Sequence, residues 1–256
     1  MHDRSRPGQT KLVQLWTASF RELAPYYNVT PAVMDENERR RESALRFAVD
    51  RWRFRLGRFF LRSVLSSLVD VPSNRLRFGQ TASGKPFLIL PHRHCTPSFS
   101  FSHCRELVCV VASHGCELGV DVETIRPVPD ISLIARRTFT DGEMRVVESA
   151  ARPEIEFFRI WTCREAVGKA MGTGLLEPHL GSGVGFADER TISWCGIDEN
   201  GHGRQFRVLN IGDDSHAAAL AVETEGPVRV KSACFKSAVL LDYPGWSSRR
   251  LSQFRV

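Results

Sequence analysis

Two short segments hold the residues with the clearest chemical potential. Asp121 and Glu123 stand two positions apart in the strand-like run GVDVE (119–123), so both carboxylates point to the same side of an extended chain. The repulsion between two carboxylates that lie this close must be relieved by a proton, a base or a cation. A hard cation such as Mg²⁺ binds carboxylate oxygens and keeps positions for water and substrate phosphates. The pair therefore suggests a metal site, although an exposed strand face has the same pattern.

The second segment, WTCREAVGKAMGTGL (161–175), has helical spacing. Glu165 would supply a third oxygen ligand from the helix, and Lys169 follows one turn later, where it could balance the charge of a phosphate. The simpler interpretation is a surface Glu–Lys pair worth roughly 0.2–0.5 kcal/mol. Against it, the helix places Trp161 and two glycines on the side of Glu165, which predicts that another group approaches there.

Basic residues accompany these acids. His103 and Lys85 come from turns upstream and could contact phosphates; three acids with such cations are the set that metal-assisted phosphoryl transfer needs. Arg53 projects into the apolar stripe of a helix, so its charge requires an anion, either a structural carboxylate or a ligand phosphate. Four further arginines recur at helical spacing, and they form either a solvated face or a surface that docks an acidic partner. They are Arg51, Arg55, Arg58 and Arg62.

The elements expected to position these residues alternate between strands and helices. Apolar periodicity predicts strands within 11–20, 81–90, 97–113 and 117–125, helices over 36–70, about 130–150 and 155–172, and short strands from 183 to 223. The order strand–helix–strands occurs twice and breaks near 116–119. This repetition indicates two similar halves packed together.

The composition narrows the class of protein. The chain has 256 residues, a formal net charge of +6 and a pI near 9.1, which favours an anionic partner: nucleic acid, an anionic membrane, a phosphorylated cofactor or an acidic protein. No run approaches the ~18 apolar residues of a membrane span, and residues 1–16 lack the apolar core of a secretion signal. The seven cysteines form no C-x-x-C pair, so we predict reduced thiols in a cytoplasmic protein and no zinc site.

The two acidic segments together resemble the paired motifs of 4′-phosphopantetheinyl transferases of the surfactin-synthetase type. The motifs are GVDVE and W-T-x-R-E-A-x-x-K-x-x-G-x-G-L; GKP (84–86), FSFSH (99–103) and RRTFTDGE (136–143) match further family segments. The resemblance covers roughly residues 36–225. It implies an α+β fold, a pseudo-dimer of two similar α/β halves with the active site at their junction. The halves would be 1–116 and 117–225, with 226–256 an extension of unknown role.

The resemblance also implies a reaction: transfer of 4′-phosphopantetheine from coenzyme A to a serine of an acidic acyl or peptidyl carrier protein, with Mg²⁺ or Mn²⁺, by a monomer that binds neither nucleic acid nor membrane. Asp121, Glu123 and Glu165 would hold the metal, Glu165 would be the base, and Lys169 would stabilise developing charge. The implied coenzyme A contacts are Arg40, Arg53, Lys85, Ser102, His103, Arg164 and Lys169. Arg164 stands where the family most often has Lys, so a contact there would be altered.

Two other functions fit parts of the sequence. A nucleic-acid-binding module would use the arginine series at 51–62 and the basic residues after 226, but three acids would repel a phosphate backbone unless a metal were present. A relative that binds carrier proteins without catalysis would share the fold. The intact set of Asp121, Glu123, Glu165 and Lys169 argues against it.

Overall fold

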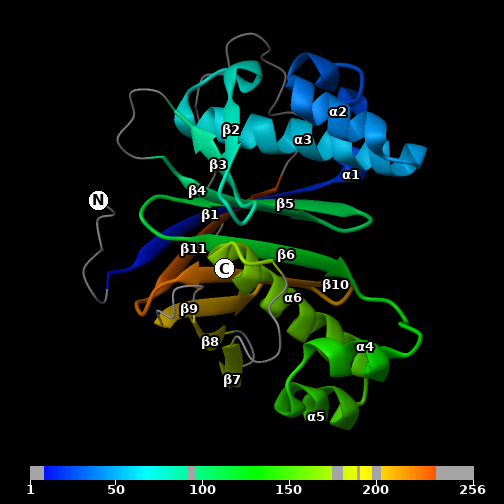
Figure 1. Ribbon diagram of the computed structural model, residues 1–256, viewed down its shortest axis with the longest axis vertical. Helices are drawn as coiled ribbons and strands as arrows, with labels where there is room; N and C mark the ends of the chain where they lie inside the picture. Colours follow the sequence, from blue (N-terminus) through cyan, green and yellow to red (C-terminus); the bar gives the residue numbers. More distant parts are fainter. Residues whose placement is uncertain (1–8, 91–95, 175–180, 189–190, 198–202, 235–256) are drawn as a thin grey trace.

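The computed structural model describes residues 9–90, 96–174, 181–188, 191–197 and 203–234 and has a mixed α/β architecture (Figure 1). Two β-sheets face each other in the middle of the molecule, and helices lie on the outer side of each sheet. Apolar side chains from both sheets form one buried cluster between them, which includes Val13 and Val111 from the first sheet and Val120 and Leu220 from the second. Burial of this apolar surface holds the two sheets together.

The first sheet contains four strands. Their spatial order is β11 (Val228–Cys234), β1 (Lys11–Ser19), β5 (Leu107–Ser113) and β4 (Ser98–His103). Strand β1 is parallel to β11 and antiparallel to β5. Three helices lie on its outer side: α1 (Phe20–Leu23), α2 (Glu36–Ala44) and α3 (Ala48–Val69). A two-stranded ribbon of β2 (Arg77–Gln80) and β3 (Pro86–Ile89) completes this part of the fold.

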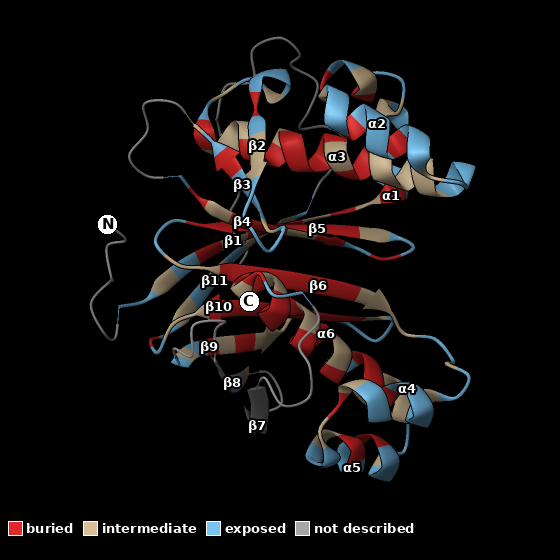
Figure 2. Ribbon diagram, viewed as in Figure 1, coloured by how far each residue is buried: buried red, intermediate tan, exposed pale blue. Residues whose placement is uncertain are grey.

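The second sheet is antiparallel and contains five strands. Their order is β6 (Leu118–Thr124), β10 (His216–Glu223), β9 (Gly203–Asn210), β8 (Thr191–Ile197) and β7 (Gly181–Asp188). Its helices are α4 (Ile131–Thr138), α5 (Asp141–Ser149) and α6 (Pro153–Met171). Figure 2 shows β5 and β6 almost entirely buried, whereas the outer faces of α2, α4 and α5 are exposed.

Most of the predicted elements are confirmed, but the long helix over 36–70 is divided. Leu45 and Phe47 have extended backbone between α2 and α3, and Asp35 caps α2 through a reciprocal pair of contacts with Glu38. The two helices therefore fold back on each other rather than forming one rod. The ribbon strand β2 and the strand β11 were not predicted.

The fold-back corrects the interpretation of the arginine series on α3. The series pairs with acids of α2 and its cap: Arg55 with Glu42, Arg58 with Glu38, and Arg62 with both Glu38 and Asp35; Arg51 donates to the carbonyls of Leu45 and Arg46. The Arg62 side chain is 0% exposed, and its two carboxylate contacts are each 2.7 Å long. The prediction of a solvated or partner-docking face is therefore wrong for Arg55, Arg58 and Arg62, because their charges are neutralised within the protein.

The segment after residue 226 is also more than an extension. Val228–Cys234 forms β11, which runs alongside β1 from Lys11 to Thr17. Val228 and Val230 pack against the cluster between the sheets. The predicted boundary at 226 is therefore wrong for 228–234, which belong to the first sheet; residues 235–256 lie outside the described residues. Within the described ranges, the helices include none that combines the length and apolarity required to cross a membrane.

Candidate active site

Strand β6 presents its acids as the alternation predicted. Leu118, Val120 and Val122 enter the cluster between the sheets, and Asp121 and Glu123 point to the opposite side. Helix α6 lies on that side. Pro153 begins the helix, and Gly172, with a φ of 82°, ends it in a left-handed conformation that suits glycine.

Close contact between strand and helix depends on Gly119. A Cβ atom at this position would lie 2.0 Å from the carbonyl oxygen of Ala166 and 2.6 Å from the backbone nitrogen of Ala170. Only a residue without a side chain permits this approach. The glycine of GVDVE thus sets the distance between β6, which carries Asp121, and α6, which carries Glu165 and Lys169.

The facing surfaces of β4, β6 and α6 enclose an open pocket of about 360 Å³. The pocket brings together six residues that the sequence predicted and two aromatic side chains. Its lining consists of Phe101, Ser102, His103, Asp121, Glu123, Trp161, Glu165 and Lys169. The site residues therefore come from both sheets, because β4 is the edge of the first and β6 the edge of the second.

Asp121 lies at the centre of the polar contacts. Its Oδ1 accepts hydrogen bonds from the Ser102 hydroxyl at 2.8 Å and from the Lys169 ammonium at 2.6 Å. The same ammonium also donates to Ser102 Oγ at 3.1 Å, which closes a three-membered network. The other oxygen, Oδ2, is buried and has no hydrogen-bond partner within the described chain. A buried carboxylate oxygen without a donor is costly, so this atom is suited to a cation.

The two glutamates beside Asp121 are half-buried and electrostatically strained. Burial, followed by repulsion from Asp121, raises the pKa of both Glu123 and Glu165. Lys169 opposes the shift at both carboxyls, and Arg126, whose Nη1 lies 3.7 Å from Glu123 Oε2, opposes it at Glu123. A raised pKa is the property expected of a general base or of carboxylates that share a cation.

His103 forms the aromatic wall of the pocket together with Phe101. Their ring centroids are 5.8 Å apart, and Phe20 contacts His103 from the other side at 5.9 Å. Burial lowers the pKa of His103, and the charges of Lys169 and Arg53 act in the same direction. The imidazole is therefore biased toward its neutral form. Phe101 was not predicted as a site residue, because a phenylalanine in a strand carries no chemical signal of its own.

Four predicted cofactor contacts do not line the pocket: Lys85, Arg40, Arg53 and Arg164. Lys85 pairs with Glu117 at 2.5 Å and donates to the Ala170 carbonyl at 2.8 Å, so it fastens the β2–β3 ribbon to the end of α6. Arg40 lies on the exposed side of α2 in an ion pair with Glu36. Arg53 donates to the Arg105 carbonyl at 3.2 Å and lies 3.6 Å from Asp50. Arg53 thus has a structural carboxylate, Asp50, as its partner, which is one of the two anions predicted for it.

Arg164 corrects a prediction. Its side chain is 0% exposed; Nη1 lies 3.0 and 2.9 Å from the two carboxylate oxygens of Glu143, and the guanidinium stacks over Trp194 with its carbon 5.5 Å from the ring centroid. These partners lie on α5 and β8, on a different side of α6 from Glu165. The predicted coenzyme A contact of Arg164 is therefore wrong, since a fully buried side chain cannot reach a ligand in the pocket.

Carboxylates gathered beside an ammonium group are a set that phosphoryl transfer can use. Comparison with known proteins gives the family. Residues 117–223 match the family model described as the 4′-phosphopantetheinyl transferase superfamily, and residues 14–115 match the model described as 4′-phosphopantetheinyl transferase, N-terminal. The chain belongs to the 4′-phosphopantetheinyl transferase superfamily, and its enzyme class is that of the phosphopantetheinyl transferases.

Two sequence relatives agree with this assignment. The 4′-phosphopantetheinyl transferase HetI of Nostoc sp. is 30% identical over 167 residues, which cover 64% of this chain and 70% of HetI. The human L-aminoadipate-semialdehyde dehydrogenase-phosphopantetheinyl transferase is 29% identical over 148 residues, but these span only 48% of that protein and 54% of this chain. Among solved structures, the holo-acyl-carrier-protein synthase of Thermotoga maritima matches at 23% identity with a TM-score of 0.34, over 42% of this chain and 62% of that one.

Proposed function

We propose that this protein transfers 4′-phosphopantetheine from coenzyme A to a serine of an acyl or peptidyl carrier protein. The serine hydroxyl oxygen forms a bond to the phosphorus that carries the pantetheine. The bond from that phosphorus to the bridging oxygen of the pyrophosphate breaks, and adenosine 3′,5′-bisphosphate leaves. The serine proton goes to a base at the site.

The observation that carries this proposal is the convergence of Asp121, Glu165 and Lys169 on one pocket. Glu165 is the best candidate for the base, because burial and Asp121 raise its pKa while the pocket leaves it accessible. Lys169 already neutralises Asp121 and is placed to stabilise the charge that develops on the pyrophosphate. Ser102 fixes both groups through its hydroxyl.

The donor types fit a hard divalent cation, Mg²⁺ or Mn²⁺, but the carboxylate oxygens of the three acids do not all lie within 4.8 Å of one another in the described chain, so the side chains would have to close on the ion. Asp121 offers a buried oxygen with no hydrogen bond from the described residues, and Glu123 and Glu165 line the same pocket with side chains that are only half-buried. These three residues would hold the ion. The ion would neutralise part of the charge of the pyrophosphate, which is the main obstacle to attack by an oxygen nucleophile.

The arrangement supports the further parts of the proposal. Ser102 and His103 come from the first sheet and Asp121 from the second, as expected if two similar halves form a pseudo-dimer with coenzyme A at their junction. Arg53, near His103, is the remaining candidate for a phosphate contact. The net charge of +6 suits an acidic carrier protein. We further propose a cytoplasmic monomer; the ion pairs of Arg55, Arg58 and Arg62 within the protein weaken the case for nucleic-acid binding by the α3 arginines.

The test is a mass measurement. Purified protein, coenzyme A, Mg²⁺ and a panel of apo carrier proteins should give a carrier heavier by about 340 Da, the mass of the transferred group. Glu165→Gln should abolish the shift, and the control Glu148→Gln, at an exposed position on α5, should retain it. If no carrier of the panel gains mass, the proposed activity is wrong.

A further inference from the structure

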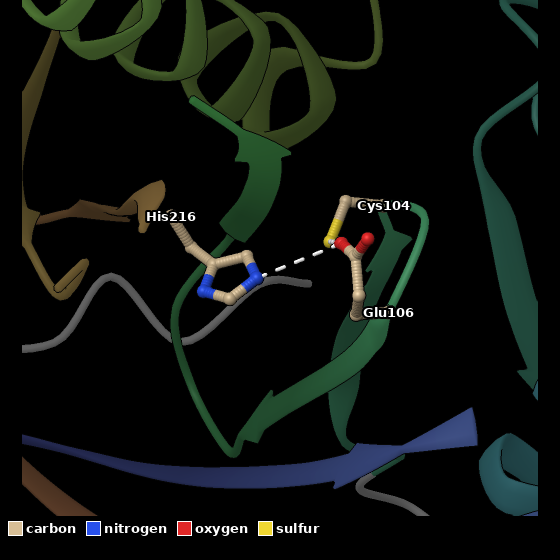
Figure 3. A group of neighbouring side chains, drawn as sticks. All are labelled: Cys104, Glu106 and His216. Carbon is tan, nitrogen blue, oxygen red and sulfur yellow. Dashed lines mark hydrogen bonds and ion pairs between the residues drawn. The ribbon is translucent and has the colours of Figure 1, made fainter. Parts of the chain in front are cut away.

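We propose that Cys104, Glu106 and His216 form a second metal site, one that binds Zn²⁺ and is separate from the acidic pocket. Cys104 and Glu106 lie at the turn between β4 and β5, and His216 is the first residue of β10. In the part of the chain that the structure describes, this is the group of potential ligands whose donor atoms all lie within 4.8 Å of one another. Figure 3 shows the three side chains directed toward a common point.

The distances are close to those of a bound ion. His216 Nε2 lies 3.7 Å from Glu106 Oε2, and Cys104 Sγ lies 3.9 Å from the same oxygen. Tetrahedral zinc with its usual bond lengths separates its nitrogen, oxygen and sulfur ligands by about 3.3–3.6 Å. A contraction of a few tenths of an ångström therefore suffices for the two distances to Glu106, and the third pair, Cys104 and His216, has its donor atoms within 4.8 Å.

The surroundings orient two of the ligands. Asp213 Oδ1 lies 3.1 Å from His216 Nδ1, so it can accept the Nδ1 proton and leave the Nε2 lone pair directed at the site. The Thr124 hydroxyl donates to Glu106 Oε2 at 2.7 Å. A carboxylate behind a histidine and a hydroxyl on a carboxylate ligand are the outer contacts that metal sites use to fix their ligands.

The ligand types identify the metal. Cysteine sulfur and histidine nitrogen select zinc over magnesium, which prefers oxygen, and three protein ligands leave a fourth position for water. Cys104 is 7% exposed, so the thiol is shielded from bulk solvent. The sequence predicted no zinc site, because a search for paired cysteines cannot find ligands that are 112 residues apart.

The location gives the site a structural consequence. It would connect the β4–β5 turn of the first sheet to β10 of the second. It also adjoins the acidic pocket, because the ligand Cys104 follows His103, and Thr124, which donates to Glu106, follows Glu123. An ion bound only by the folded protein raises its stability. The proposal does not depend on the phosphopantetheinyl transfer proposed above.

Cobalt provides a direct test, because Co²⁺ replaces Zn²⁺ and a thiolate ligand gives it an intense charge-transfer absorption. The full-length protein is stripped with a chelator and titrated with Co²⁺. We expect a thiolate-to-cobalt band that saturates at one ion per chain and disappears on addition of Zn²⁺. Ions in the acidic pocket, which offers oxygen and nitrogen ligands only, cannot give this band.

Variants assign the ligands. Cys104→Ser should abolish the band, and His216→Asn should weaken cobalt affinity 10–100-fold. Cys116→Ser, which changes a half-buried thiol outside the proposed site, should leave the band unchanged. Zn²⁺ should also raise the melting temperature of the wild type but not that of Cys104→Ser. Absence of the band, its persistence in Cys104→Ser, or unchanged affinity in His216→Asn would overturn the proposal.

Discussion

Replacing Gly119 by alanine tests whether the contact between β6 and α6 positions the active site. The added Cβ would lie 2.0 Å from the Ala166 carbonyl oxygen and 2.6 Å from the Ala170 nitrogen. Both are backbone atoms, so no side-chain rotation can relieve the clash. For the closer contact to reach 3.4 Å, where ordinary van der Waals contact begins, the helix and strand must separate by about 1.4 Å.

The separation should reduce both stability and activity. Overpacking of this kind costs about 1–3 kcal/mol, and a clash with the backbone of a buried helix belongs at the upper end, about 3 kcal/mol. That corresponds to a fall in Tm of about 6–12 °C for a chain of this size. Displacement of Lys169 and Glu165 from Asp121 by more than 1 Å should lower kcat/KM about 100-fold at temperatures where the variant stays folded.

Urea unfolding and the rate of carrier modification measure the two effects. Gly203→Ala is the matched control, because its added Cβ would meet no atom within 4 Å; it should resemble the wild type in both assays. Wild-type stability in Gly119→Ala would show that the contact is not as tight as described. A destabilised variant with normal kcat/KM would refute the argument that this contact sets the catalytic geometry.

Two further substitutions test the charges of α6. In metal-free protein, burial and Asp121 raise the pKa of Glu165, so the stability linked to its proton is complete below the ordinary value of 4.5 and is lost as pH rises through the raised pKa. Glu165→Gln should flatten this decline when the free energy of unfolding in urea is measured from pH 4.5 upward. An unchanged pH profile would contradict the argument that Glu165 is buried. Arg164→Ala should lower the free energy of unfolding by about 3 kcal/mol, since Glu143 loses its buried cation, and should leave the KM for coenzyme A unchanged within about twofold. Normal stability with a raised KM would instead restore the predicted contact of Arg164 with coenzyme A.

The predictable part of the site is the part that depends on local periodicity. Alternation on β6 fixed which side Asp121 and Glu123 occupy, because one face of the strand must be apolar. Helical spacing placed Glu165 and Lys169 on neighbouring faces of α6. These inferences require only that the strand and helix form, and both are strongly encoded.

The incorrect predictions concern residues whose partners come from elsewhere in the fold. Arg164 lies on a helix that is buried on several sides, between the second sheet and α5, so no single face is the polar one. The α3 arginines looked solvated because their acids precede the turn at 45–47 and return to them only after the chain folds back. Periodicity shows the side on which a residue points but not which element will cover that side.

The pocket lies between the edge strands of the two sheets. Its geometry therefore depends both on the local periodicity of each element and on the contacts between elements. Val120 donates its backbone N–H to the Ser100 hydroxyl at 3.1 Å, and the next serine on β4, Ser102, donates to Asp121. Two serines of one edge strand thus bind successive residues of the other edge strand. This pairing fixes the register between the sheets, so the same contacts that join them also align Lys169 with Asp121. A change at the junction, such as Gly119→Ala, should therefore affect the assembly of the fold and the geometry of the site together.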